Sequence, residues 1–370
     1  GPKMYNSYIQ IVRDVGTDKS RFLNELLQNA DDCQYTQSSR SPHFVLAMRG
    51  DVLQASYNED GFTKDNVRAL TAMGESTKKL LLTGSTQSIG EKGVGFKSVF
   101  GVAQSVEIHS NGFHFRLTDT LPTVPEKCEV LEQKEGTTMV FRMKKDISSY
   151  FSVDRILQLC ICLRNLKELT ILNHTVKITE RGAYRTVEID GQKYRYEKIE
   201  YDFSISDQTA LNERNINGRN VDPKQRIICY IPDRVKDRDM LLYSGLPTTI
   251  KINVPLIIDA PFELTTSRES LLHNKWNEFI RGHMYKAILN IMDLKKETGL
   301  EIFRYVGFRS AGGVTTWQNF DDDYLNIYNW AIALREQKIL PVLGGGNSVS
   351  AMGSNCVMIP EFIAKQQEYE

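Results

Sequence analysis

The stretch ELLQNADD, residues 25–32, predicts a helix with one polar face near the start of the chain. Glu25, Asn29 and Asp32 fall at i, i+4 and i+7, so a helix from 19 to 36 would gather their oxygen atoms on one side while the intervening leucines and alanine turn toward a core. A carboxylate and an amide oxygen one turn apart suit a hydrated Mg²⁺ ion and an attacking water. A solvated surface stripe is the competing interpretation.

Composition narrows the class of protein. The chain has 370 residues, enough for two or three domains, and its 46 basic and 46 acidic residues cancel. Neutrality does not indicate nucleic acid as a partner, and no apolar run is long enough to indicate a membrane span. The six cysteines include no CxxC pair, which favours reduced thiols and an intracellular setting, cytoplasmic or nuclear. The Gly1-Pro2 start and the abrupt end lead us to expect an excised piece of a longer protein.

The pattern of elements predicts an α+β fold. Helices over 5–37 precede a hairpin of two strands at 43–57, an order typical of an α+β layer sandwich. A first domain would close near residue 150, with further helical segments at 65–73 and 96–102 and strands at 105–109, 113–117 and 137–143. A second domain, 151–300, would begin with an amphipathic helix over 153–170, contain a polar insertion over 206–224 and end with a helix over 269–295. Residues 301–370 would form a C-terminal extension with a helix at 322–337.

Three further motifs carry chemistry. Residues 58–63, NEDGFT, follow a strand, where a polar side chain can contact the edge of a ligand; alone this is an ordinary turn. Residues 90–98, GEKGVGFKS, place glycines before a helix start, where backbone N–H groups can approach phosphate oxygens. Residues 135–141, EGTTMVF, form a turn that leads into a strand.

In this order the four motifs resemble the nucleotide site of the GHKL ATPase superfamily, which includes gyrase B, the ninety-kilodalton heat-shock chaperone, MutL and the histidine kinases. Within these motifs the amino-acid sequence is most similar to that of the chaperone-like sacsin and NO VEIN branch. Residues 246–248, LPT, and 259–269, DAPFELTTSRE, add to the resemblance. It implies a Bergerat-type α/β sandwich that binds ATP and Mg²⁺, followed by a middle-like domain and a truncated sacsin-like extension.

The resemblance also implies roles for single residues. Glu25 would be the general base, Asn29 the Mg²⁺ ligand, and Asp32 would support the base-reading end of the pocket. Arg268 would reach the γ-phosphate, for which its planar fork is suited; a structural arginine that pairs with Glu269 is the alternative. Residues 74–90 would form a lid that closes over ATP. The remaining ligand contacts would come from Lys92, Gly93, Val94, Gly95, Phe96 and Lys97 toward the phosphates and from Asn58, Asp60, Gly61 and Thr137 toward adenine.

Two departures from the family pattern matter. The family's D-x-G-x-G appears here as NEDGF, so either Asn58 or Asp60 would read the base. A carboxylate accepts from the adenine amino group, whereas an amide can flip and serve either purine, so Asn58 as the reader would weaken purine discrimination. Asn24 stands where the chaperone has an arginine beside its catalytic glutamate.

We expect a slow Mg²⁺-dependent ATPase whose lid closure drives rearrangement in a larger protein. A nucleotide-gated scaffold without hydrolysis is the second class of function. A MutL-like or MORC-like DNA-associated ATPase is a third, which the neutral charge of the chain does not support. An ATP-dependent homodimer is left open, and the clients are not indicated. The six histidines are scattered, which supports neither a histidine kinase, a metal-ligand cluster nor a Ser/His/Asp site.

Overall fold

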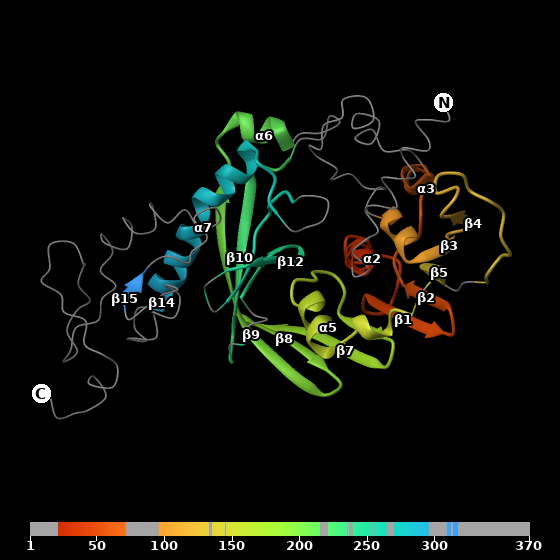
Figure 1. Ribbon diagram of the computed structural model, residues 1–370, viewed down its shortest axis with the longest axis horizontal. Helices are drawn as coiled ribbons and strands as arrows, with labels where there is room; N and C mark the ends of the chain where they lie inside the picture. The colour runs from red at the N-terminus through yellow and green to blue at the C-terminus, as the bar shows by residue number, and fades with distance from the viewer. Residues whose placement is uncertain are drawn as a thin grey trace, which may run out of the picture. The chain divides into compact units, whose positions relative to one another are not determined.

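The computed structural model describes residues 21–71, 96–132, 135–144, 146–214, 221–234, 236, 240–252, 254, 256–264, 270–295, 309–311 and 314–316. Over these residues the protein is α+β, with a large mixed sheet and several helices (Figure 1). The chain divides into two compact units. Unit 1 comprises Gly1–Glu197, Tyr243–Ile250 and Glu263–Leu272, and unit 2 comprises Lys198–Leu242, Lys251–Phe262 and His273–Glu370. The domain limits expected at residues 150 and 300 stay predictions.

Eight neighbouring strands that lie wholly in unit 1 follow the order β8-β7-β6-β1-β2-β5-β3-β4. Neighbours in this order pair antiparallel except β1 and β6, which run parallel. Phe44, Leu53 and Phe141 are fully buried, as expected for strands whose alternate side chains face a core. The strands are β1 (His43–Arg49), β2 (Val52–Tyr57), β3 (Ala103–Ser110), β4 (Phe113–Thr118), β5 (Thr137–Met143), β6 (Glu168–Ile171), β7 (His174–Arg181) and β8 (Tyr184–Ile189).

Short helices accompany this sheet. Helix α2 (Arg21–Asp31) packs against the 3₁₀ helix η1 (Phe96–Gly101), and α5 (Val153–Cys160) contacts β8. Residue Ser152 caps α5, because its side chain accepts a hydrogen bond from the Arg155 amide. The remaining helices of this unit are α3 (Lys64–Thr71) and the single-turn η2 (Ser148–Tyr150).

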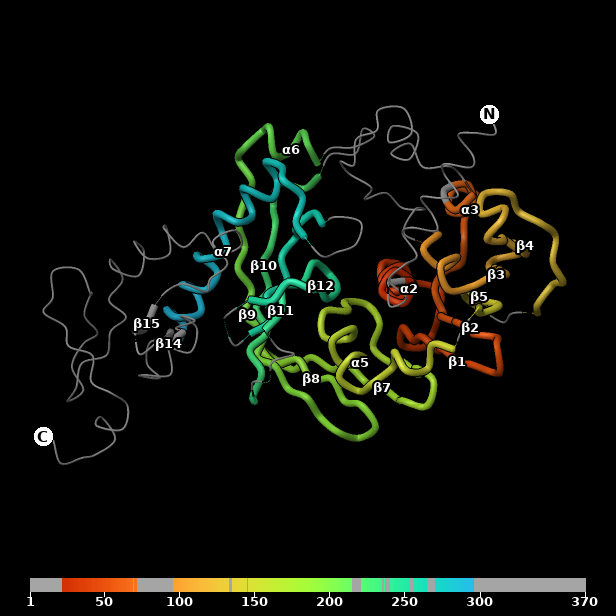
Figure 2. The backbone as a smooth tube through the Cα atoms, in the orientation of Figure 1, coloured from red at the N-terminus to blue at the C-terminus, as the bar shows by residue number. Residues whose placement is uncertain are grey.

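Unit 2 pairs a long helix with strands. Strand β9 (Gln192–Ser204) begins in unit 1, where it pairs with β8, and continues into unit 2 beside β10 (Lys224–Pro232). Helix α7 (Lys275–Leu294) starts at the N-cap Asn274 and contacts both β10 and α6 (Gln208–Arg214). The tubes of α6 and α7 lie next to one another in Figure 2. Unit 2 also contains β13 (Ile257–Asp259), β14 (Arg309–Ala311) and β15 (Val314–Thr316). Strand β11 (Leu241–Ser244) crosses from unit 2 into unit 1 at Tyr243, and β12 (Leu246–Lys251) belongs to unit 1 except for its last residue.

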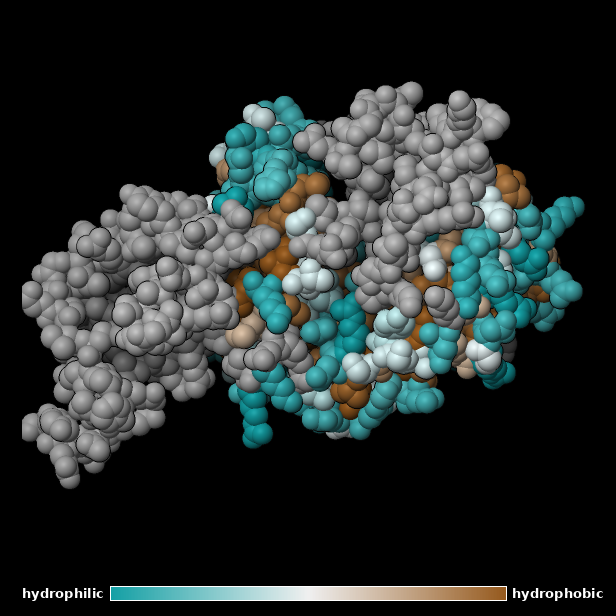
Figure 3. Space-filling view, viewed as in Figure 1, coloured by the Kyte–Doolittle hydropathy of each residue, from teal (hydrophilic) through white to brown (hydrophobic). Residues whose placement is uncertain are grey.

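The exposed side of α6 is hydrophilic in Figure 3, and the helix buries Ala210 on its other side. Among the described helices, none combines the length and the apolar character that crossing a bilayer requires. The five described cysteines, which are Cys33, Cys128, Cys160, Cys162 and Cys229, form no disulfide.

Two predicted elements were wrong, and a third segment contains a helix that was not predicted. The helix expected over 153–170 ends at Cys160, because the apolar run continues into a buried loop that is held from α2, as described below. The segment expected to start an α-helix at 96–102 is a 3₁₀ helix that leads directly into β3. The insertion over 206–224 contains α6, whose first amides at Thr209 and Ala210 are capped by Asp207.

Candidate functional site

A buried carboxylate lies where three strands of unit 1 end. Glu59 follows β2, and the residue is 7% exposed. Its Oε2 accepts a hydrogen bond from the Gly61 amide at 2.9 Å, and its Oε1 accepts one from the Thr137 hydroxyl. Thr137 Oγ1 also lies 2.5 Å from Ser110 Oγ. The sheet register explains the grouping, because Thr137 pairs with Tyr57 at the end of β2 and with Ser110 at the end of β3.

The electrostatics of Glu59 are unusual for a turn residue. Burial raises the pKa of its carboxyl above the ordinary value, and the hydrogen bonds from Thr137 and Gly61 oppose that rise without cancelling it. Removing a carboxylate from water is costly unless its surroundings compensate for the lost hydration. A buried, perturbed carboxyl beside two hydroxyl groups is therefore a candidate functional group. Sequence reasoning missed Glu59, although it occupies the acidic position two residues before glycine that the D-x-G pattern specifies.

Gly136 makes this junction possible. Its φ is +73°, and a Cβ at this position would lie 2.1 Å from the Tyr57 carbonyl oxygen. Only glycine tolerates both the left-handed backbone and so close an approach. The glycine before Thr137 thus lets β5 begin directly against the end of β2.

The two residues predicted to read a base, Asn58 and Asp60, form hydrogen bonds with other residues of the chain. Asn58 is buried, and its Nδ2 donates to Ser38 Oγ at 2.9 Å and to the Ser41 carbonyl at 3.2 Å. Its Oδ1 accepts from the His43 amide at 2.8 Å. These bonds connect the end of β2 to the segment before β1.

Asp60 also forms hydrogen bonds within the chain. Its carboxylate accepts from the amides of Thr36 and Gln37 at 2.7 and 2.9 Å and from the Thr36 hydroxyl, and these bonds lower its pKa. The Asp60 amide donates to the Gln34 carbonyl at 2.9 Å. The segment after α2 is therefore fastened to the turn after β2. The Gly61 predicted beside them has φ +89°, and a Cβ there would lie 2.7 Å from the Asn111 side chain.

The predicted face of α2 is present in part. Leu23, Leu26, Leu27 and Ala30 are buried, as the sequence predicts. Glu25 and Asn29 are half-buried on the helix, whereas Asp32 lies exposed in the turn beyond its end. The segment around Gly245 adjoins this helix, since a Cβ on Gly245 would lie 4.0 Å from Gln28 Nε2.

The neighbouring Asp31, not Asp32, is the buried carboxylate at the end of α2. It accepts hydrogen bonds from the amides of Arg164, Asn165 and Leu166 at 2.7 to 2.8 Å. Asn165 Nδ2 in turn donates to the Asp31 carbonyl at 2.6 Å. Asp31 thereby holds the loop between α5 and β6, which explains why α5 stops short of its predicted length.

An arginine reaches the start of the predicted catalytic face from another element. Arg155 on α5 donates from Nη2 to Asn24 Oδ1 at 2.9 Å, and Asn24 is buried beside Glu25 in sequence. The arginine that the sequence lacks at position 24 is thus replaced, in space, by a guanidinium that contacts position 24.

The segment predicted to bind phosphates is described only at its end. Phe96 and Lys97 are buried in η1, next to α2, and burial lowers the pKa of Lys97 to about 8. Lys92, Gly93, Val94 and Gly95, the predicted lid at 74–90 and Arg268 lie outside the described residues.

Part of the chain resembles Protein NO VEIN of Arabidopsis thaliana. The two are 47% identical over 105 residues, which make up 28% of this chain. The chain is a partial homologue of NO VEIN. The matched segment spans only 4% of the length of that protein. No family model matches the chain.

Proposed function

We propose that this chain is a GHKL-type module with a Bergerat-type fold that binds ATP with Mg²⁺ and hydrolyses it slowly. Within a longer protein, closure of the segment 74–90 over ATP would drive rearrangement of the chain. The partial homology to NO VEIN agrees with the sequence resemblance to the sacsin and NO VEIN branch.

The buried Glu59 cluster is the observation that carries the proposal. A carboxylate held by Thr137 and Gly61 at the ends of strands can accept the adenine amino group while the Thr137 hydroxyl fixes its orientation. We therefore assign base reading to Glu59 in place of Asn58 or Asp60, whose polar atoms bind the segment 34–43.

The catalytic end would lie along α2. The turn that carries Glu59 is bound to Gln34, just after the helix, and Glu25 lies about 9 Å along the axis before the helix ends. Adenine beside Glu59 would then leave the phosphates to extend toward Asn29 and Glu25. Asn29 would supply an oxygen ligand to Mg²⁺, which takes few protein ligands and keeps several waters, and Glu25 would orient or deprotonate the attacking water.

Calorimetry and phosphate release together test this proposal. We expect the chain to bind ATP only weakly without Mg²⁺ and to release phosphate slowly with it. The Glu25→Ala variant should keep ATP affinity and lose phosphate release, and Asn29→Ala should lose the dependence of binding on Mg²⁺. Glu168→Ala, which removes an exposed carboxylate from β6, is the matched control and should behave as the unaltered chain.

Each failure has a distinct meaning. Absence of ATP binding by the unaltered chain would refute the proposal. Binding without phosphate release would instead identify a nucleotide-gated scaffold. Equal phosphate release by Glu25→Ala and the unaltered chain would assign the activity to another residue or to a contaminant.

A further inference from the structure

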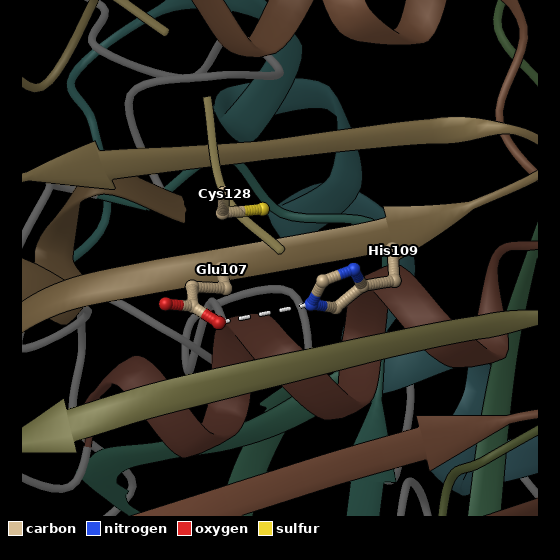
Figure 4. Close-up of side chains that lie close together, drawn as sticks. All are labelled: Glu107, His109 and Cys128. Atoms are coloured by element: carbon tan, nitrogen blue, oxygen red, sulfur yellow. Dashed lines mark ion pairs between the residues drawn. The ribbon is translucent and has the colours of Figure 1, made fainter. Parts of the chain in front are cut away.

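Three side chains with different metal-binding atoms meet beside β3 of unit 1. They are Glu107 and His109 on β3 and Cys128 in the segment after β4. One ligand atom from each lies within 4.8 Å of the other two, and His109 Nε2 lies 3.8 Å from Glu107 Oε2. Figure 4 shows the carboxylate and the imidazole ring facing one another with Cys128 beside them.

The strand register explains how residues distant in sequence come together. Glu107 and His109 are two apart on β3, so their side chains leave the same face of the sheet. Arg116 of β4 pairs with Glu107 and forms an antiparallel bridge to Glu126. Cys128, two residues further on, returns to that face. The spacing between His109 and Cys128 is too long and irregular to indicate a metal site in the sequence.

The distances are close to those of a zinc site. Zn²⁺ binds histidine nitrogen and carboxylate oxygen at about 2.0–2.2 Å and thiolate sulfur at about 2.3 Å, so tetrahedral ligands lie about 3.3–3.6 Å from one another. The 3.8 Å between His109 and Glu107 is near that range. Small side-chain movements would bring the Cys128 sulfur into it.

Two neighbours hold the ligands in the required orientation. Arg116 Nε donates to Glu107 Oε1 at 2.9 Å, and Arg116 Nη2 contacts the same oxygen, which leaves Oε2 directed at His109. His109 Nδ1 lies 3.0 Å from His114 Nδ1. A proton on His109 Nδ1 that is donated to His114 leaves the Nε2 lone pair for a metal, which is the usual arrangement around metal-binding histidines.

From this geometry we propose that Glu107, His109 and Cys128 bind a Zn²⁺ ion, with Arg116 and His114 as positioning residues. One nitrogen, one sulfur and one carboxylate ligand favour Zn²⁺ over the hard ions Mg²⁺ and Ca²⁺, which prefer oxygen alone. Water completes the fourth position. The ion ties the segment 119–132 to β3, so it fixes the connection between β4 and β5.

Cobalt substitution tests the proposal on the full chain. Co²⁺ takes the place of Zn²⁺ in tetrahedral sites and gives a thiolate-to-metal charge-transfer band when a cysteine binds it. We expect the unaltered chain to bind one Co²⁺ with this band and to release it on addition of Zn²⁺ but not of Mg²⁺. Cys128→Ser should lose the band, and Cys33→Ser, which removes a half-buried thiol elsewhere in unit 1, should keep it.

Affinity and stability give independent measurements. His114→Phe should weaken Zn²⁺ binding about 10- to 100-fold, as removal of the residue that orients a metal-binding histidine typically does. Zn²⁺ should raise the melting temperature of the unaltered chain and not that of Cys128→Ser, and the two proteins should have the same melting temperature and circular dichroism in EDTA. A missing band in the unaltered chain, or an equal band in Cys128→Ser, would overturn the proposal. Neither result bears on ATP binding.

Discussion

Replacement of Glu59 by glutamine removes the charge of the proposed base reader while keeping its shape. In the unaltered chain each carboxylate oxygen has its own donor, the Gly61 amide on one side and the Thr137 hydroxyl on the other. Glutamine has one oxygen and one NH₂ group, so its oxygen can accept from the Gly61 amide while its NH₂ group donates to the Thr137 hydroxyl, which can turn to donate to Ser110. The variant can therefore keep its internal bonds, but it no longer offers a negatively charged oxygen to the adenine amino group.

The size of the effect follows from the bond that is lost. A hydrogen bond to a charged group contributes about 1.5–3 kcal/mol, so ATP affinity should fall about 10- to 150-fold in Glu59→Gln. GTP should lose less, because an amide can rotate to place its NH₂ group opposite the guanine carbonyl, which a carboxylate repels. The preference for ATP over GTP should therefore shrink.

Titration calorimetry with ATP and GTP in the presence of Mg²⁺ measures this preference as a ratio of dissociation constants. Asp60→Asn is the matched control, since its carboxylate binds Thr36 and Gln37 and should not affect the ratio. A ratio that changes in Asp60→Asn but not in Glu59→Gln would refute the assignment. Equal affinity for the two nucleotides in the unaltered chain would also refute it and would favour the amide of Asn58.

Three further predictions concern stability. Asp31→Ala leaves three backbone amides of the loop after α5 without their acceptor. It should lower the free energy of unfolding, measured by urea titration, by about 2–4 kcal/mol. The control Asp32→Ala removes an exposed carboxylate and should change that free energy by less than about 0.5 kcal/mol. Gly136→Ala combines a left-handed backbone with a close contact to the end of β2 and should lower the free energy of unfolding by at least about 2 kcal/mol. The control Gly182→Ala has φ +59° and open space around the new Cβ, so it should lower that free energy by about 1 kcal/mol. Equal losses in the two variants would contradict the role of the close contact. The folded chain binds the Glu59 proton more tightly than the unfolded chain does. The contribution of Glu59 to the free energy of unfolding is therefore greatest below its ordinary pKa of 4.5 and declines as the pH rises through the pKa of the folded state. Urea titrations across this range should give a flatter pH dependence for Glu59→Gln than for the unaltered chain.

Local patterns predicted much of unit 1. The hairpin of β1 and β2 was predicted at 43–57, and its register is regular from Phe44 to Arg49. The apolar spacing of α2 predicted its buried leucines. These features depend on residues close in sequence, where a period of two or of 3.6 is visible.

Long-range contacts explain the failures. Residues 161–166 continue the apolar pattern of α5, yet the Asp31 carboxylate takes the amides that a longer helix would have used. Cys128 joins His109 only because β4 lies between their segments. Glu59 is an intermediate case: its spacing from Gly61 was visible, but its burial depends on how β3 and β5 pair with β2.

Arg155 shows how a residue that a motif lacks can be supplied by the fold. Position 24 holds asparagine, and from the motif alone the surroundings of Glu25 lack the arginine found in the chaperone. In the structure the Asn24 amide oxygen accepts from the Arg155 guanidinium, which α5 carries from 131 residues further along the chain. Asparagine is short enough to leave room for that guanidinium and polar enough to bind it, whereas an arginine at position 24 would repel it. The asparagine and the distant arginine therefore form one feature, and a missing motif residue is weak evidence against a catalytic role for Glu25 until the contacts of its neighbours are known.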